Sequence, residues 1–344
     1  MSDRPNPNSI ARRVVVGIGL VCVFGGACTP TPYSEGPSGS GCVVAYDDNV
    51  WCNWVSYGSG ASQNGQIVRS LAPGLHPVII VVHGGSWTQG NFDPGTVPPL
   101  LPGSAFHDGP VPSPISTWLM DRVASGYGLF AINHRMASPD VPGTQAPGAV
   151  LDVKLAVRWV KQTGALYGLD PARVTLLGTS SGGHLAVTAA STIGVEGWEP
   201  TEIPEQTSTV ESVVSLAGIF DFSAELLDPR NVNPLDIASA AMFLGCSIPG
   251  GFVPPDPCTD LATTPASPVN NVSSPGFHIP SLFLVTAGRA GPGDQWVSSA
   301  QYASYAAALT AAGHPFEDCD DPVGNHFQFD YCMPELNAWL DALP

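Results

Sequence analysis

The feature that most constrains the fold of this chain is an alternation of short, uninterrupted apolar runs with longer amphipathic segments. Residues 78–82 are five β-branched residues in a row, and residues 127–135 and 210–219 give similar strand patterns. Between the strands, residues 149–167 carry apolar side chains at three- and four-residue spacing, which is typical of a helix. Buried strands that alternate with helices predict an α/β fold, with a mostly parallel sheet covered on both faces.

The alternation continues toward the C-terminus, with three interruptions. Residues 279–288 predict a further strand, and residues 294–313 predict the helix after it. The interruptions are a Pro/Gly-rich stretch (90–115), an acidic loop (194–208) and a long irregular insertion (223–278). Long loops in compact folds are usually functional or disordered. Because Cys246 and Cys258 are expected to form a disulfide within the insertion, we expect it to form an ordered, loop-rich cap over the edge of the sheet.

The N-terminal residues indicate export and do not belong to the fold. Two consecutive arginines precede a short apolar run, which small residues follow as far as Cys28. This pattern predicts a signal peptide over residues 1–27, and the Gly-Gly-Ala-Cys sequence resembles a bacterial lipobox in which Cys28 receives a lipid. We expect a cell-surface lipoprotein with a Pro/Gly/Ser tether over residues 28–41 and a folded domain over residues 42–344. The alternatives are ordinary secretion after signal cleavage and an uncleaved N-terminal anchor.

The net charge limits the partners of the chain. It is −17 at pH 7, from 29 acidic and 12 basic side chains. Such a surface repels nucleic acid and anionic lipid, so we expect no nucleic-acid partner, and membrane contact only through the N-terminal lipid. Neutral substrates suit this field better than anionic ones.

Six cysteines lie in the expected folded domain, as three pairs of near neighbours. An even number in an exported chain favours disulfides, and short spacing favours pairing between neighbours. A zinc site would require C-x-x-C or clustered histidines, and neither pattern occurs, so we expect no metal. The expected disulfides are Cys42–Cys52, Cys246–Cys258 and Cys319–Cys332.

One G-x-S-x-G sequence runs from Gly178 to Gly182, with Ser180 at its centre. It lies between a strand expected at Val174–Leu177 and a helix expected from Gly183 onward. A serine at such a tight turn projects above the sheet, and glycines flank it because larger side chains would clash. Ser180 is therefore the candidate nucleophile, and an ordinary helix N-cap serine is the alternative.

A pair of glycines follows the first buried strand and suits the same chemistry. A serine nucleophile generates a tetrahedral oxyanion, which requires preorganised N–H donors roughly 3 Å away. Gly84 and Gly85 allow the backbone to approach that oxygen closely, and the amide of Ser181 provides a third donor. We expect His83, at the end of the strand, to be a buried brace for this loop and not a catalytic base.

Four sequence blocks occur in this order: HGGSW (83–87), D-x-K-x-A-V-R-W-V (152–160), YGLDPARV (167–174) and GTSSGGHLA (178–186). Together they resemble the α/β-hydrolases of the hormone-sensitive-lipase-like and bacterial feruloyl/acetyl-esterase-like (BD-FAE-like) group. The similarity runs from about residue 66 to the end of the chain. Ser86 stands where a third glycine is frequent, and His134 stands where tyrosine is usual, which is expected to alter the packing beneath the site.

The resemblance implies a catalytic triad in the chain order Ser, Asp, His. His326 lies in a loop, VGNHFQF, that resembles the family's G-x-H-x-F loop, and it is the candidate base; we expect this loop to follow the last helix and strand. Asp294 stands where the family carries its triad acid, and its alternative role is the N-cap of the helix that it opens. Three other acids lie nearer to His326 in sequence, but a loop would hold them less rigidly. They are Asp318, Asp320 and Asp321.

The expected activity is therefore hydrolysis of carboxylic esters through an acyl-enzyme on Ser180, with no metal or organic cofactor. The expected substrates are neutral small-molecule or glycan-linked esters. Two alternatives share the same fold. One is an amide-cleaving relative, such as a peptidase or formamidase, and the other is a surface-binding homologue without catalysis.

Overall fold

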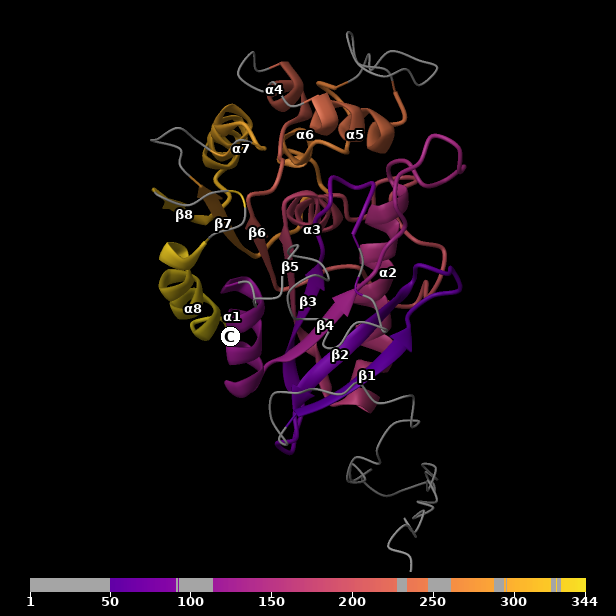
Figure 1. The fold of residues 1–344 in the computed structure, drawn as a ribbon, viewed down its shortest axis with the longest axis vertical. Helices are drawn as coiled ribbons and strands as arrows, with labels where there is room; N and C mark the ends of the chain where they lie inside the picture. The colour runs from indigo at the N-terminus through magenta and orange to yellow at the C-terminus, as the bar shows by residue number, and fades with distance from the viewer. Residues whose placement is uncertain are drawn as a thin grey trace, which may run out of the picture. The chain divides into compact units, whose positions relative to one another are not determined.

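A computed structural model describes the chain from residue 50 to its end, with gaps. The described residues all lie within the compact unit Ser38–Pro344, and they form the eight-stranded sheet drawn in Figure 1. They are residues 50–90, 92, 114–227, 234–246, 261–287, 294, 296–322, 326 and 329–344.

The sheet is mostly parallel, so the expected α/β class is confirmed. Its strands are β1 (Val50–Ser56), β2 (Asn64–Ser70), β3 (His76–Val82), β4 (Gly128–Ile132), β5 (Leu169–Thr179), β6 (Ser212–Leu216), β7 (Ser281–Ala287) and β8 (Glu317–Asp321). Across the sheet they follow the order β1-β2-β4-β3-β5-β6-β7-β8. β2 is antiparallel to β1 and β4, and every other neighbouring pair is parallel.

Helices cover both faces of this sheet (Figure 1). On one face, α1 (Pro114–Ala124) packs beside α8 (Met333–Asp341), where the indole of Trp118 donates to Asn337 over 2.7 Å. The other face carries α2 (Gly148–Thr163), α3 (Ser181–Ser191) and α7 (Ser299–Ala312). Three further helices lie in or beside the insertion 223–278: α4 (Phe222–Leu227), α5 (Pro234–Leu244) and α6 (Pro268–Asn271).

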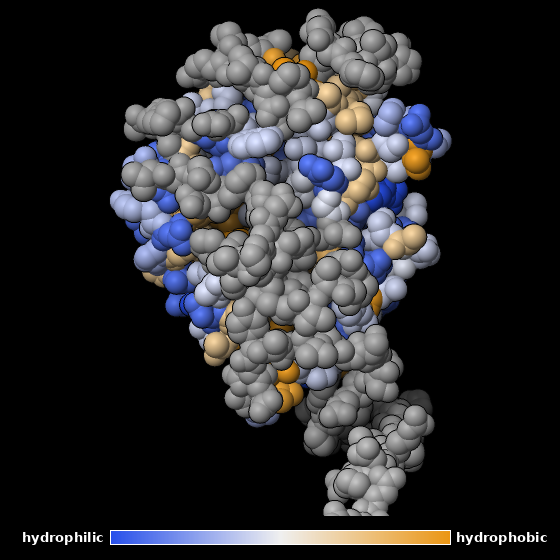
Figure 2. Space-filling model, in the orientation of Figure 1, coloured by the Kyte–Doolittle hydropathy of each residue, from blue (hydrophilic) through white to orange (hydrophobic). Residues whose placement is uncertain are grey.

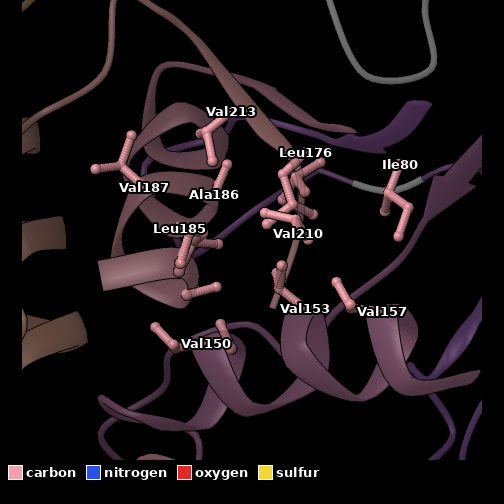
Figure 3. Close-up of a cluster of buried hydrophobic side chains, with 14 of the residues drawn as sticks. Ile80, Val150, Val153, Val157, Leu176, Leu185, Ala186, Val187, Val210 and Val213 are labelled. Atoms are coloured by element: carbon pink, nitrogen blue, oxygen red, sulfur yellow. The ribbon is translucent and has the colours of Figure 1, made fainter. Parts of the chain in front are cut away.

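Each central strand contributes to two cores, because successive side chains point to opposite faces. In β3, Val78, Ile80 and Val82 belong to the cluster beneath α2 and α3. Ile79 and Val81, from the same strand, belong to the cluster beneath α1 and α8. Figure 3 shows part of the first cluster, where aliphatic side chains of α2 meet those of α3 and the strands. Full burial of one such side chain stabilises the fold by about 1.5–3 kcal/mol.

Where Figure 2 is coloured, most of the surface is hydrophilic, with apolar residues scattered among polar ones. Apolar side chains scattered singly are normal on a protein surface. Within the described ranges, no helix has both the length and the apolar character needed to cross a bilayer. The exposed large apolar side chains are Leu71, Leu75, Val141, Leu166, Trp296 and Tyr331.

The acidic loop 194–208 is fixed to α2 by a buried ion network. The ammonium of Lys154, which is fully buried, donates to two backbone carbonyls and to Glu199 over 2.8 Å. Arg158 donates to the other oxygen of the same carboxylate over 2.6 Å. Burial lowers the pKa of Lys154 to about 8, and its pairing with Glu199 opposes this shift. The carboxylate of Glu199 thus pairs with two buried cations and offsets the cost of burying their charges.

Two helices differ from the sequence expectation. The helix expected over 294–313 begins only at Ser299, because the hydroxyl of Ser298 accepts a hydrogen bond from the Ala300 amide and caps the helix there. Asp294 therefore does not open this helix. The helix expected over 149–167 becomes a 3-10 turn at Gly164.

Other elements were not predicted from the sequence, or were predicted wrongly. β8 reads Glu-Asp-Cys-Asp-Asp, which has no apolar periodicity, yet it pairs in parallel with β7. α8 follows His326, so the expectation that no helix comes after this loop is wrong. The insertion 223–278, expected to be irregular, contains the helices α5 and α6.

Candidate active site

The candidate site residues follow the carboxyl ends of parallel strands. His83 comes after β3, Ser180 after β5, Asp294 after β7 and His326 after β8. Because β3, β5, β6, β7 and β8 all run in the same direction, these ends meet at one edge of the sheet. That edge is where open α/β sheets bind ligands.

Ser180 lies in a strained turn between β5 and α3. Its φ of 53° and ψ of −126° lie outside the regions that L-residues favour. Its amide donates to the carbonyl of Leu216 over 2.8 Å, and its own carbonyl accepts from the amide of His184 over 3.0 Å. The turn is therefore held from β6 and from α3, as a strand-to-helix serine turn requires.

The glycines around Ser180 are required by close backbone packing. A Cβ on Gly178 would lie 2.2 Å from the carbonyl oxygen of Gly182, and one on Gly182 would lie 2.2 Å from that of Val82. A Cβ on Gly84 would lie 3.3 Å from the Cβ of Ser180. The loop after β3 therefore reaches the serine with its backbone.

That loop is tightly turned. The amides of Thr88 and Gln89 both donate to the carbonyl of Gly85 over 3.1 Å. Gly85, Ser86 and Trp87 have φ values of 115°, 50° and 60°. Ser86 thus adopts a conformation that glycine enters more easily, so a glycine would suit this position equally well.

The three expected oxyanion donors lie at this edge. Among the residues that the structure describes, none accepts a hydrogen bond from the amides of Gly84, Gly85 or Ser181. Gly84 packs against Ser180, and Ser181 begins α3, whose N-terminus favours negative charge. Unpaired amides beside a serine hydroxyl are suited to stabilising an oxyanion.

His326 and Asp294 form a buried pair. Nδ1 of His326 lies 2.6 Å from Oδ2 of Asp294, and their side chains are 4% and 6% exposed. The other carboxylate oxygen accepts from the backbone amides of Trp296 and Val297. A carboxylate held in this way orients the imidazole through Nδ1, which is the arrangement of an acid and a base in a catalytic triad.

The three alternative acids contact other groups. Asp318 accepts a hydrogen bond from the hydroxyl of Tyr302 over 2.5 Å. Asp320 accepts from Thr286 over 2.9 Å, and Asp321 is buried at the end of β8. The carboxylate described in contact with His326 is that of Asp294.

A disulfide closes the loop that carries His326. Cys319, in β8, is bonded to Cys332, and their Cα atoms are 5.7 Å apart. The two cysteines are buried, and they flank the histidine in sequence. The bond therefore limits how far this loop can move from the edge of the sheet.

Two buried imidazoles stack beneath the loop after β3. The ring centroids of His83 and His134 are 4.2 Å apart, with 16° between the ring planes. Burial lowers the pKa of both, and the neighbouring ring lowers that of His83 further. Both are therefore neutral near pH 7. His83 braces the loop, and His134 fills the position where tyrosine is usual.

His184 connects α3 to the same loop. The indole Nε1 of Trp87 lies 3.0 Å from Nδ1 of His184, and Nε2 lies 2.7 Å from the carbonyl oxygen of Ala266. Because an indole N–H only donates, Nδ1 accepts, and Nε2 carries the proton that it donates to Ala266. Burial lowers the pKa of His184 to about 4. No pattern in the sequence pointed to Trp87 as the partner of His184.

Several expected features lie outside the described residues. These are the signal peptide, the tether with Cys28, and most of the stretch 90–115. Cys52 and Cys246 are each disulfide-bonded, but their expected partners Cys42 and Cys258 are not described. Within the described ranges, no three His, Cys, Asp or Glu side chains are grouped as metal ligands.

Comparison with known proteins gives matches in sequence and in structure. A family model, BD-FAE, matches residues 100–251. Esterase LipQ of Mycobacterium tuberculosis is 28% identical over 285 residues, which make up 80% of this chain and 56% of LipQ. Carboxylesterase NlhH of the same organism is 26% identical over 259 residues, or 75% of this chain and 68% of NlhH. The chain thus spans little more than half the length of LipQ.

A solved structure matches over most of its length. A truncated carbohydrate esterase from gut microbiota covers 88% of this chain and 98% of its own, with a TM-score of 0.62 and 22% identity. At this identity, the match establishes the fold.

Proposed function

Because this chain has the α/β-hydrolase fold and resembles the BD-FAE family, we propose that it is a serine hydrolase acting on carboxylic ester bonds. One observation carries the proposal. At one edge of the sheet, the strained Ser180 adjoins the unpaired amide of Gly84, and a buried His326–Asp294 pair follows neighbouring strands.

The mechanism follows from these roles. His326 Nε2 removes the proton of Ser180 as its Oγ attacks the ester carbonyl, and Asp294 stabilises the resulting imidazolium. The amides of Gly84, Gly85 and Ser181 bind the oxyanion. Collapse of the tetrahedral intermediate releases the alcohol, which takes the proton from His326. Water activated by the same imidazole then hydrolyses the acyl-enzyme and frees the acid.

The substrates proposed are neutral small-molecule or glycan-linked esters. The net charge of −17 disfavours anionic substrates. Relatives named esterase or carboxylesterase, and a structural relative named carbohydrate esterase, support an ester as the scissile bond.

The test combines covalent labelling with kinetics. A fluorophosphonate probe should label the unmodified protein and not Ser180→Ala, and Ser180→Ala should lose at least about 10⁴-fold in kcat on p-nitrophenyl acetate. Asp294→Asn should lose a comparable factor. Labelling that survives Ser180→Ala would overturn the assignment of the nucleophile. Faster turnover of aminoacyl anilides than of p-nitrophenyl esters would favour amide cleavage instead.

We also propose export, with attachment to the membrane through a lipid on Cys28. The motif pattern of residues 1–28 supports this location. Cells expressing the full chain should incorporate radiolabelled palmitate into the protein, and Cys28→Ser should abolish incorporation. Release of an unlabelled protein to the medium would point to ordinary secretion.

A further inference from the structure

The loop after β3 must be held in place if it is to bind an oxyanion. We propose that His184, by accepting the hydrogen bond from Trp87, positions residues 84–87 for oxyanion binding; this role rests on the ester hydrolysis proposed above. His184 is a positioning residue here, because it contacts the loop and not the reacting atoms.

The loop does not keep its shape through its own backbone preference. Ser86 and Trp87 both have positive φ, at 50° and 60°, and such a conformation costs a non-glycine residue about 1–3 kcal/mol. Strain of this kind persists only where surrounding contacts impose it. The contacts of Trp87 therefore help to fix where Gly84 and Gly85 lie, together with the backbone hydrogen bonds to the Gly85 carbonyl.

The indole of Trp87 is held by one directional contact among apolar ones. Its ring stacks on Phe243 of α5 with centroids 5.0 Å apart, and it meets Phe222 at 5.4 Å. Apolar contacts tolerate sliding of one ring over another. The Nε1–Nδ1 hydrogen bond to His184, at 3.0 Å, fixes both the position and the direction of the indole edge.

His184 is itself tied to the nucleophile. It lies one helical turn after Ser180, and its amide donates to the Ser180 carbonyl over 3.0 Å. Its imidazole cannot rotate freely, because Nε2 donates to Ala266 over 2.7 Å. The first turn of α3 therefore sets the position of the serine and, through Trp87, the position of the loop that faces it.

The two ring nitrogens have different roles, and two amide side chains can separate them. In His184→Asn, the amide oxygen can take the place of Nδ1 and still accept from Trp87. In His184→Gln, the amide nitrogen can take the place of Nε2 and still donate to Ala266, but the acceptor for the indole is lost. Both changes replace a buried ring with a smaller amide, so both remove similar packing.

The experiment measures kcat and KM for p-nitrophenyl acetate hydrolysis by these variants of the full chain. We expect His184→Gln and Trp87→Phe to lower kcat by about 10–100-fold, with KM changed less than about two-fold, because the loop acts mainly in the transition state. His184→Asn should recover kcat to within about five-fold of the unmodified protein. The double variant Trp87→Phe/His184→Gln should be no slower than either single variant, since both break one bond.

His76→Gln is a matched control. His76 is also a buried histidine, and its two nitrogens lie 2.8 Å from the Gly126 carbonyl and 3.2 Å from that of Ala72. It lies at the opposite end of β3 from the loop. Its substitution should lower the melting temperature while leaving kcat unchanged. As a second readout, the indole N–H resonance of Trp87 should shift in His184→Gln much more than in His184→Asn.

The outcomes separate this inference from the proposed function. Unchanged kcat in His184→Gln, or equal losses in the Gln and Asn variants, would overturn the positioning role alone. If the unmodified protein shows no Ser180-dependent hydrolysis, the proposed function fails, and the positioning role fails with it.

Discussion

The middle of the sheet and its carboxyl edge are built differently. In the middle, Ile80 of β3 pairs in register with Leu176 of β5, and both side chains are fully buried in regular extended backbone. At the edge, the chain turns through positive φ values, and the buried side chains include the imidazoles of His83 and His184. The non-glycine residues with positive φ at this edge are Ser86, Trp87, Ser180 and Ala217.

This difference indicates how stability and reactivity are divided. Regular apolar strands stabilise the fold. The carboxyl edge contains backbone conformations and buried polar groups that lower the stability of the fold. Changes within the edge should therefore disturb catalysis, and changes to distant buried contacts should disturb stability alone.

The largest effect expected is that of Gly182→Ala. The added Cβ would lie 2.2 Å from the Val82 carbonyl oxygen and 2.5 Å from that of His83, so the backbones of the serine turn and β3 would have to separate. We expect a loss of more than about 4 kcal/mol in unfolding free energy, together with loss of activity, in urea titrations and esterase assays. Gly126→Ala is the control. Gly126, unlike Gly182, has positive φ, so its alanine variant carries backbone strain, but its added Cβ would meet nothing within 4 Å. A Gly182 variant as stable as the control would contradict the packing described.

The buried ion network should affect stability without affecting catalysis. Glu199→Gln would leave Lys154 and Arg158 without their shared carboxylate, which should lower the unfolding free energy by about 3 kcal/mol. The network lies on α2, away from the catalytic edge, so kcat should stay within about two-fold. Glu205→Gln, on the exposed part of the same loop, should change neither quantity. A fall in kcat for Glu199→Gln at a temperature where it is folded would show that the two regions are coupled.

The disulfide should affect both properties, because it belongs to the edge. Cys319→Ala/Cys332→Ala removes a cross-link with a sequence separation of 13, and a loop of this size stabilises a fold by about 3 kcal/mol. Since His326 lies inside the loop, kcat should also fall. Chemical denaturation and kinetics on the double variant measure the two effects, and an unchanged kcat would mean that the loop keeps its position without the bond.

Counted for a single side chain, the smallest effect is that of acid on buried histidines. The pKa values of His83, His134 and His184 are lowered by burial, that of His184 to about 4, whereas an unfolded histidine has a pKa of about 6.5. Unfolded chains therefore bind more protons below pH 6.5. The stability should be fully present above that pH and should fall by about 1.4 kcal/mol per pH unit for each histidine as the pH decreases toward the folded pKa. Urea unfolding between pH 7.5 and 5 measures this slope.

His134→Phe isolates one of these histidines. It keeps a ring beside His83 and removes one titrating group, so the dependence on pH should become shallower by the contribution of one histidine. An identical slope in this variant would mean that His134 is not a buried neutral group.

Local patterns made some parts of the molecule predictable. The runs around Ile80 and Leu176 are apolar because both faces of the sheet are covered, and this alone indicated parallel strands. The G-x-S-x-G sequence located the strained serine, since its glycines are needed where backbones nearly touch. The resemblance to esterases identified Asp294 and His326, which then proved to be hydrogen-bonded partners.

The other features of the fold and of the site depend on contacts between residues far apart in the chain, which a local sequence pattern does not reveal. β8 is a strand because its backbone pairs with the edge of the sheet at β7. The helix expected from Asp294 starts later because Ser298 is the residue that caps it. The Trp87–His184 bond joins positions 97 residues apart in the chain. Only the folded arrangement of β3 and α3 brings them together.

The composition of β8 has a consequence for how copies of this protein meet. β8 lies at one of the two edges of the described sheet, and an edge strand can template pairing with a neighbouring molecule. Four of its five residues are acidic. Two copies approaching along this strand would bring like charges face to face, so the repulsion that makes β8 a poor strand former also discourages self-association into larger sheets.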